Sequence, residues 1–509
     1  MQKKINGLPE ADMVRYDTLN RENLTKYAHF DIVYMLEAFL LLDPVLKARH
    51  NEKGVEIENS LIYPLVEMER NGFKADKQYL EDSKIKVKNY IIERRQRFYE
   101  LAGREVKIGQ HAAIKKILQD KYHLEIATTN AAELDIVLSG LIHDKANPDA
   151  IEFIKILQEL RTLEKWYSTY IIRFLKNLHG TDRLYTAINQ VGTISGRVTS
   201  DFQQFPKKPI MTVDGEELFN PRRMITNSGG DFNGFVLLDF SQIELRFQAF
   251  YTILVGHPDL NLCRAYMPYQ CHLADGTEYD YHNIEHVRDW KNQWYYDEQP
   301  GVLWSPTDVH GATTEKATGF KPGTPEFKTA RSVIGKRVNF AKNYGASRKR
   351  MRIMFPEATE EEVTRIDNSY YEAFPGVKFY HQYCYDRAQL SSWTANLYGI
   401  RYYNTSGHKL INLLIQGSAA FYLKTKIREL YDYSKEHNIK TRWLMQIHDE
   451  LMWERHKDEI EVFFEFKKIM EDWPDTFVPI VAEMDASNAS WADKKGIDNI
   501  EELRLCLGS

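Results

Sequence analysis

Three acidic residues stand where apolar runs of the sequence end. Asp239 directly follows a run of four apolar residues, and Asp449 and Glu450 stand between two further apolar runs. The first pattern predicts a buried strand, and the second predicts a tight hairpin with acids at its tip. Carboxylates from two strand ends can hold a pair of divalent ions, which activate an attacking hydroxyl and stabilise a leaving phosphate oxygen. A lone acid after a strand is more often a helix cap, so this chemistry requires the two turns to meet.

A basic segment offers a second group of reactive side chains. Residues 328–352 contain nine Lys or Arg residues and no acidic residue, although the whole chain has a net charge of −5. Within it, Lys336, Phe340 and Tyr344 are spaced four residues apart and would share one face of a helix. An amphipathic stripe facing the core is the alternative. A lysine and two rings on one face of a basic helix favour a surface that binds phosphates and stacks on bases.

The elements that must position these residues form an α+β pattern. A length of 509 residues predicts about three domains. Helical spacing predicts a first helix over 31–42 that closes at Asp43–Pro44, and further helices over 55–70, 77–101 and 148–178. Short strands and turns begin near residue 181, and the last third mixes helices with strands.

The cysteine content and the apolar runs limit the cellular context. The chain has four cysteines, and none form Cys-x-x-Cys, so a reducing compartment is expected. No signal peptide or membrane-spanning run is visible, which predicts a cytoplasmic protein with no membrane partner. Cys263, Cys271, His272 and His282 lie close in the sequence, but their spacing matches no standard zinc knuckle. A plain surface insertion is the preferred interpretation of this region.

Three strings in fixed order resemble a known family. D-F-S-Q-I-E-L-R at 239–246, K-R-V-N-F-A-K-N-Y-G at 336–345 and Q-I-H-D-E-L at 446–451 resemble motifs A, B and C of family A DNA polymerases, the DNA polymerase I type. Several shorter stretches extend the likeness from about residue 20 to the C-terminus: 69–76, 165–170, 195–206 and 412–420. Independent motifs in the family's order are far more specific than one short pattern.

The resemblance implies an α+β right-hand fold, with an antiparallel palm sheet and helical fingers and thumb. The implied domains are a remnant of a 3′–5′ exonuclease-like domain at 1–50, the thumb at 51–180, the first part of the palm at 181–250, the fingers at 251–400 and the second part of the palm at 401–509. The fingers would include an insertion at about 261–305 that is much longer than the family usually has.

The resemblance also implies roles for individual residues. Asp239 and Asp449, with the backbone carbonyl of Phe240, would bind two Mg²⁺ ions, for which Mn²⁺ can substitute. Glu450 would be an accessory acid beside them. Lys336 would act as a catalytic residue that protonates the leaving pyrophosphate. The nucleotide-binding residues would be His310, Arg331, Lys336, Phe340, Tyr344, Glu244 and Gln242. The DNA-binding residues would be Arg197, Gln203, Asn412, Gln416, His448 and Lys165.

Particular functions follow from these roles. Glu244 would crowd the 2′ position of the sugar and exclude ribonucleotides. Phe340 would stack on the incoming nucleotide, and Tyr344 would cover the templating position. Arg197 and Gln416 would reach the minor groove, where every base pair presents similar acceptors, and would check pair shape without reading sequence.

Two features depart from the family pattern. The family places an arginine four residues before the motif B lysine, whereas Arg331 lies five before Lys336. One residue rotates a helix by about 100°, so Arg331 must reach the phosphates from a bulge or a helix end. Tyr27 and Asp31 resemble the third exonuclease motif, but no Asp-x-Glu precedes them. One carboxylate cannot hold two metal ions, which predicts no intrinsic proofreading.

The predicted function is template-directed DNA synthesis from a primer 3′-hydroxyl, in replication or repair. The predicted partners are primer–template DNA and dNTPs, and a separate exonuclease or processivity factor is a further candidate. An RNA-synthesising right-hand polymerase and a catalytically inactive DNA-binding relative are the alternatives. Glu244 argues against the first, and the joint presence of Asp239, Lys336 and Asp449 argues against the second. The compact polymerase with its insertion also resembles a bacteriophage enzyme, which would act in the cytoplasm of the host cell.

Overall fold

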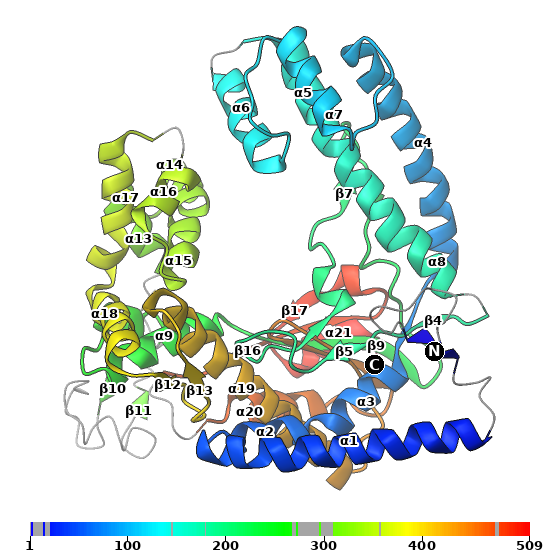
Figure 1. Cartoon of the computed structure of the whole chain (residues 1–509), viewed down its shortest axis with the longest axis vertical. Coiled ribbons are helices and arrows are strands. Elements are labelled where there is room, and N and C mark those ends of the chain that lie inside the picture. Colours follow the sequence, from blue (N-terminus) through cyan, green and yellow to red (C-terminus); the bar gives the residue numbers. More distant parts are fainter. Residues whose placement is uncertain are drawn as a thin grey trace.

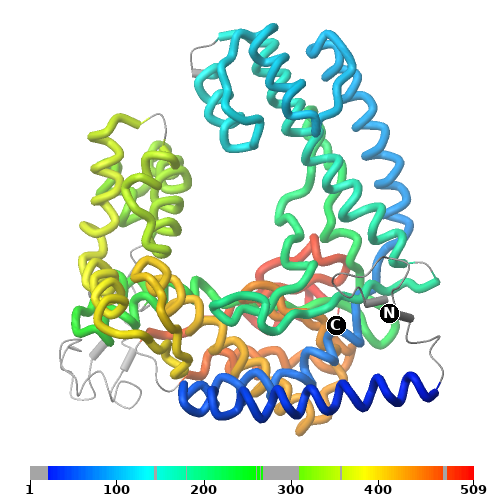
Figure 2. The backbone as a smooth tube through the Cα atoms, viewed as in Figure 1, coloured from blue at the N-terminus to red at the C-terminus, as the bar shows by residue number. Residues whose placement is uncertain are grey.

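Two helical arms rise from opposite sides of a base that contains a β-sheet (Figure 1). The structure is a computed structural model. It describes residues 21–143, 146–178, 180–266, 309–355, 358–473 and 478–508, together with the backbone of short strands at 2–3, 14–15, 271–272 and 295–296. The tube in Figure 2 shows that the base is built from both early and late parts of the chain, whereas the second arm comes from one continuous stretch.

The base is organised around a five-stranded antiparallel sheet. Its strands, in spatial order, are β14 (Arg442–Ile447), β15 (Glu450–His456), β9 (Phe232–Phe240), β16 (Ala482–Ser487) and β17 (Lys495–Ile497). β9 is the central strand, and it pairs with β15 on one side and with β16 on the other. The strand and hairpin predicted around Asp239 and Asp449 are therefore present.

The alternation of side chains along β9 determines which face of the sheet carries chemistry. Val236, Leu238 and Phe240 pack into a core beneath the sheet, whereas Phe235 and Leu237 belong to a second core that continues into one arm. Because successive side chains point to opposite faces, Asp239 lies on the same face as Phe235 and Leu237.

The first arm is a pair of long helices with a small helical tip. The helices are α4 (Lys77–Ala102), α5 (His111–Asp120), α6 (Ala131–His143), α7 (Pro148–Trp166) and α8 (Arg173–Asn177). Asp76 caps α4 by accepting a hydrogen bond from the backbone N–H of Tyr79. Apolar residues of α4 and α7 form the core between the two long helices, and α5 and α6 lie at the end of the arm (Figure 1).

The second arm is entirely helical among the residues described. It contains α13 (Val309–Thr318), α14 (Pro325–Ala330), the π-helix η5 (Arg331–Gly335), α15 (Lys336–Asn343), α16 (Arg348–Met354) and α17 (Glu360–Ala373). Buried apolar residues of α13, α15 and α17 form its core. The ion pair between Lys342 Nζ and Asp367 Oδ1, at 2.5 Å, ties α15 to α17.

Further helices lie below and beside the sheet. They are α1 (Arg21–Ala48), α2 (Glu52–Ser60), α3 (Ile62–Asn71), α9 (Ile243–Leu254), α10 (Leu260–Arg264), α18 (Pro375–Leu390), α19 (Gly407–Glu436), α20 (Val462–Glu471) and α21 (Ile500–Leu507). α19 packs against α18, α9 and α20, and thereby joins the second arm to the base. Among the described residues, no helix is both long and apolar enough to cross a membrane.

Short two-stranded ribbons complete the structure. The pairs are β1 (Gln2–Lys3) with β2 (Val14–Arg15), β3 (Phe73–Lys74) with β4 (Arg183–Leu184), β5 (Ile188–Asn189) with β6 (Thr199–Ser200), β7 (Ile210–Met211) with β8 (Glu217–Phe219), β10 (Cys271–His272) with β11 (Tyr295–Tyr296), and β12 (Trp393–Ala395) with β13 (Arg401–Tyr403).

The predicted end of the first helix at Asp43–Pro44 is wrong. α1 runs from Arg21 to Ala48 with Pro44 inside it. A proline removes only its own backbone donor, and the next turn still forms, because the N–H of Arg49 donates to the carbonyl of Val45 at 3.0 Å. None of the α1 side chains is buried, and Asp31 is exposed on it.

Candidate functional site

The two acidic turns meet at one edge of the sheet. Glu450 is the direct cross-strand partner of Asp239, and Asp449 occupies the turn that joins β14 to β15. The N–H of Phe240 donates to the carbonyl of Asp449 at 3.3 Å, which holds the two turns together. His448 takes the left-handed conformation with φ 54°, as the tight turn requires.

Most of the predicted site residues line one pocket of about 440 Å³ above these turns. The predicted residues in its wall are Asp239, Phe240, Gln242, Glu244, Arg197, Phe340, Tyr344, His448, Asp449 and Glu450. The sheet, α9, α15 and the segment around Arg197 all contribute, so the pocket lies between the base and the second arm.

The carboxylates in this pocket are electrostatically strained. Burial, and then the charges of Glu450 and Asp449, raise the pKa of Asp239 to about 7. Burial raises the pKa of Asp449 to about 6, with a further contribution from Glu244 and an opposing effect of Arg197. A raised carboxyl pKa means that the protein does not fully neutralise the negative charge, and a cation bound there would be stabilised.

Glu244 is the centre of a hydrogen-bond network between the base and the second arm. Its carboxylate accepts from Tyr344 Oη at 2.7 Å, from Gln416 Nε2 at 3.2 Å and from Asn343 Nδ2 at 3.4 Å, and it also pairs with Arg197. Gln242, just before α9, has a φ of 51° and turns the chain from β9 into this helix. Glu244 therefore projects from the first turn of α9 into the pocket.

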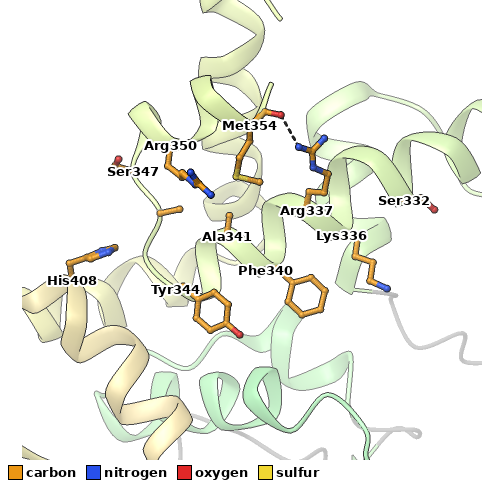
Figure 3. Close-up of a pocket in the computed structure, with 11 residues that line it drawn as sticks. Ser332, Lys336, Arg337, Phe340, Ala341, Tyr344, Ser347, Arg350, Met354 and His408 are labelled. Carbon is orange, nitrogen blue, oxygen red and sulfur yellow. Dashed lines mark hydrogen bonds between the residues drawn. The ribbon is translucent and has the colours of Figure 1, made fainter. Parts of the chain in front are cut away.

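The predicted shared face of Lys336, Phe340 and Tyr344 is present on α15 and at its C-cap. All three residues line a second pocket, of about 730 Å³, that adjoins the first through Phe340 and Tyr344 (Figure 3). Arg350 and His408 stand on the other side of it. Lys342, by contrast, is buried on the opposite side of α15 against Asp367, so it does not belong to the basic surface that the charge pattern predicted.

A π-helix absorbs the extra residue between Arg331 and Lys336. The segment Arg331–Gly335 is a π-helix, and the N–H of Lys336 donates to the carbonyl of Arg331, five residues earlier. A π-turn spaces such residues one turn apart, as an α-turn spaces residues four apart. Arg331 therefore lies one helical turn before Lys336, although the two are five positions apart in the sequence. His310 is held beside α15 by Asn339, at 3.1 Å between Nδ2 and Nδ1, with its ring 5.8 Å from that of Phe340.

The predicted DNA-binding residues divide into two groups. Arg197 and His448 line the pocket of Asp239, and Gln416 bonds to Glu244 at its wall. The side chain of Gln203 donates instead to the carbonyl of Val198 at 2.7 Å.

Asn412 and Lys165 lie outside that pocket. Asn412 lies on α19 with a buried side-chain oxygen that has no hydrogen-bond partner in the structure. Lys165 is exposed in the last turn of α7, on the first arm.

Sequence reasoning missed four polar residues of the pocket wall: Lys207, Arg222, Asn343 and Lys494. Lys207 directly follows Phe205–Pro206, and Asn343 lies inside the basic motif. The motifs could therefore have indicated both residues. Nothing in the sequence around Lys494 indicates the site, because that residue arrives through the pairing of β17 with β16.

The donor set fits Mg²⁺ bound with its substrate. Mg²⁺ is usually held by one or two carboxylates together with waters and substrate phosphates. Asp239 and Asp449 provide carboxylates of this kind, and both line the wall of the same pocket. Among the described residues, no group of three or more His, Cys, Asp or Glu side chains forms a metal cage without a substrate.

The zinc alternative is tested only at Cys263. That residue is fully buried, and burial raises the pKa of its thiol. The side chains of Cys271 and His272, residue His282 and most of the insertion at 261–305 lie outside the described residues.

The sheet, the two helical arms and the acidic pocket between the sheet and α15 together define a right-hand polymerase fold, as the motifs implied. The chain belongs to DNA polymerase family A, whose family model matches residues 77–493. It is 25% identical to DNA polymerase I of Caldicellulosiruptor bescii over 86% of the chain, and 27% identical to DNA polymerase I of Bacillus caldotenax over 89%. In both comparisons it spans 47% of the relative, so the chain covers about half the length of these curated relatives.

A solved structure shares the fold. The polymerase domain of Pol1 from M. smegmatis, in complex with DNA primer–template and dNTP, superposes with a TM-score of 0.69 at 21% identity, covering 89% of this chain and 73% of that one. The predicted α+β right-hand fold is confirmed.

Proposed function

We propose that this chain is a template-directed DNA polymerase that adds deoxynucleotides to a primer 3′-hydroxyl and releases pyrophosphate, in replication or repair. The observation that carries the proposal is the meeting of Asp239 and Asp449 in one pocket with Phe340 and Tyr344 of the basic motif. Family membership supports the reaction class, and so does the likeness to DNA polymerase I and to a Pol1 polymerase domain in complex with DNA primer–template and dNTP.

Each side chain has a task in this proposal. Asp239, Asp449 and the carbonyl of Phe240 would hold two divalent ions, Mg²⁺ or in its place Mn²⁺, which would supply Lewis-acid activation of the hydroxyl and charge stabilisation at the phosphate. Lys336, Arg331 and His310 would bind the triphosphate, and Lys336 would donate a proton to the leaving pyrophosphate. Glu450 would act as an accessory acid beside the aspartates.

Base and sugar selection would use the network around Glu244. Phe340 would stack on the incoming nucleotide, Tyr344 would cover the templating position, and Gln242 would contact the nucleotide. Glu244 would occupy the space needed by a 2′-hydroxyl. The residues that would contact the primer–template are Arg197, Gln203, Asn412, Gln416, His448 and Lys165. Arg197 would lie near the reacting end, because it is 3.9 Å from Asp449.

The domain boundaries follow the same proposal. Residues 51–180 would form the thumb, 181–250 and 401–509 the palm, and 251–400 the fingers with the insertion at 261–305. Residues 1–50 would be the remnant of an exonuclease-like domain, in which Tyr27 and Asp31 no longer act. A separate exonuclease or processivity factor would then be a further partner.

Primer extension by the purified chain tests the proposal. A labelled primer on a template should lengthen in a template-dependent order with dNTPs and Mg²⁺, and should remain unextended with EDTA. Efficient extension with rNTPs and none with dNTPs would favour the RNA-synthesising alternative, which Glu244 argues against. DNA binding without extension under any metal condition would favour an inactive relative.

A further inference from the structure

Three carboxylates stand in a row across the sheet beside the site. Glu450 on β15 and Glu483 on β16 are both direct cross-strand partners of Asp239 on β9. Side chains opposite one another project from the same face, and like charges in this arrangement destabilise a sheet. Asp485, two residues after Glu483, adds a fourth carboxylate to the face. A positive charge among these carboxylates would therefore reduce their mutual repulsion even when no metal ion is bound.

Lys494 provides that charge. Its Nζ lies 2.5 Å from Glu450 Oε2 and 2.8 Å from Asp485 Oδ2, so the side chain reaches from β16 to β15 across the central strand. The same residue lines the pocket of Asp239 and Asp449. Only 23% of the side chain is exposed, which limits how far water can weaken the two ion pairs.

The backbone on both sides of Lys494 is anchored. The preceding 3₁₀ turn, Trp491–Asp493, is held by the fully buried Trp491, whose backbone N–H donates to the carbonyl of Ile225 at 3.0 Å. Asp493 pairs with Arg223 at 2.8 Å. The following residues enter β17, which pairs with β16. The ammonium group is thus a charge of fixed position, unlike a lysine on a mobile loop.

We propose that Lys494 is a positioning residue of the polymerase site, which holds the Glu450 carboxylate toward β16 and serves as the fixed counter-charge of the sheet-edge carboxylates until divalent ions bind. This inference rests on the proposed function. It places Glu450 beside Asp239, with its carboxylate held by the same ammonium group that pairs with Asp485. The charge of Lys494 also opposes the rise in the pKa of Asp239, which the charge of Glu450 promotes.

The first test measures Mn²⁺ binding to the full chain without DNA, by electron paramagnetic resonance of the free ion. Lys494→Met releases the Glu450 carboxylate from its ion pair and lets that charge act on the cation site, so this variant should bind Mn²⁺ about threefold to tenfold more tightly than the parent chain. Lys494→Arg keeps the charge and should stay within about twofold. Lys495→Met is the matched control, because the neighbouring lysine is exposed, and its affinity should not change.

A double-mutant cycle tests whether Lys494 acts through Glu450. In a Glu450→Gln background, Lys494→Met should lose most of its gain in Mn²⁺ affinity, because the paired charge is already absent. Asp485→Asn removes a carboxylate but leaves Lys494 paired with Glu450, so it should give no gain in Mn²⁺ affinity. In primer extension, Lys494→Met should lower kcat with little change in the dNTP KM.

Two results would overturn the inference: unchanged Mn²⁺ affinity in Lys494→Met, or an equal gain in the presence and absence of the Glu450 charge. These binding results do not depend on catalysis. A parent chain that binds Mn²⁺ and obeys the cycle but never extends a primer would refute the proposed function and leave the electrostatic pairing of Lys494 and Glu450 intact.

Discussion

Burial and the charges of Glu450 and Asp449 raise the pKa of Asp239 to about 7, from about 3.9 in an unfolded chain. A carboxyl group whose pKa is raised on folding binds protons more tightly in the folded state. The stability that this tighter proton binding contributes is fully present below the pKa of the unfolded state. It is lost as the pH rises through the pKa of the folded state. Without metal ions, Asp239 therefore weakens the folded protein most above about pH 7.

A first prediction follows from this strain. Asp239→Asn removes the charge, so in EDTA at about pH 8 it should raise the Tm above that of the parent chain. The gain should shrink as the pH falls from about 7 toward 4. Scanning calorimetry at several pH values measures it, with Asp458→Asn, a largely exposed acid, as the control. A Tm gain that is the same at every pH would mean that Asp239 is not strained by its charge.

A second prediction concerns the role of Glu244 in selecting the sugar of the nucleotide. Glu244→Ala opens the space that a 2′-hydroxyl would occupy, and the ratio of dNTP to rNTP incorporation efficiencies should fall at least about tenfold. Because Glu244 also accepts the hydroxyl of Tyr344, Tyr344→Phe is the matched control, which removes that bond and keeps the carboxylate. If the control lowers the ratio as much as Glu244→Ala, the tyrosine bond and not the carboxylate governs sugar selection.

At the scale of elements, the π-helix Arg331–Gly335 determines what Arg331 can contact. We predict that Arg331→Ala raises the dNTP KM roughly tenfold to a hundredfold, since a charge-assisted phosphate contact is lost. Ser332 lines the same pocket as Lys336, so adding Ser332→Arg to that variant should restore part of the lost phosphate contact and lower KM again. Single-nucleotide incorporation kinetics measure both variants. An unchanged KM in Arg331→Ala would contradict a phosphate contact of Arg331.

The elements around the site could be predicted well where local pattern decides the structure. The apolar run before Asp239 and the paired runs around Asp449 specify β9 and the β14–β15 hairpin, because burial and a tight turn are local properties. The predicted helix end at Pro44 was wrong, because a proline removes one backbone hydrogen bond without ending the helix. The π-helix was not predicted, although the misplaced Arg331 pointed to an irregularity.

Contacts between distant segments could not be predicted. Lys342 has the same local surroundings as the other basic residues of its segment, yet it is buried because α17 brings Asp367 to it. Lys494 reaches Glu450 only through the order of strands in the sheet. Spacing within one helix or strand is readable from the sequence, whereas the partner that a charged side chain meets depends on packing of the whole chain.

At the scale of the molecule, the pocket lies between the base and the second arm, and the first arm rises from the opposite side of the base (Figure 1). Proofreading would need a second centre elsewhere. The matching acid, Asp31, is exposed on α1, and no metal cluster of three or more ligands occurs among the described residues. We predict that the purified chain does not shorten a mismatched, end-labelled primer in Mg²⁺ without dNTPs.

The Asp31→Ala variant distinguishes two outcomes that would contradict this prediction. Shortening that is abolished by Asp31→Ala would show that α1 carries a working nuclease residue. Shortening that survives Asp31→Ala would place a nuclease centre elsewhere in the chain.

We propose that Asp239 and Asp449 form the catalytic centre of DNA synthesis. Rapid-quench measurement of single-nucleotide incorporation, with the parent chain, Asp239→Asn and Asp449→Asn, tests it most directly. Each substitution keeps the side-chain shape and removes a carboxylate charge, so the rate should fall about a thousandfold or more, while primer–template affinity stays within a few-fold. Incorporation by either variant at close to the parent rate, with DNA binding intact, would contradict the account.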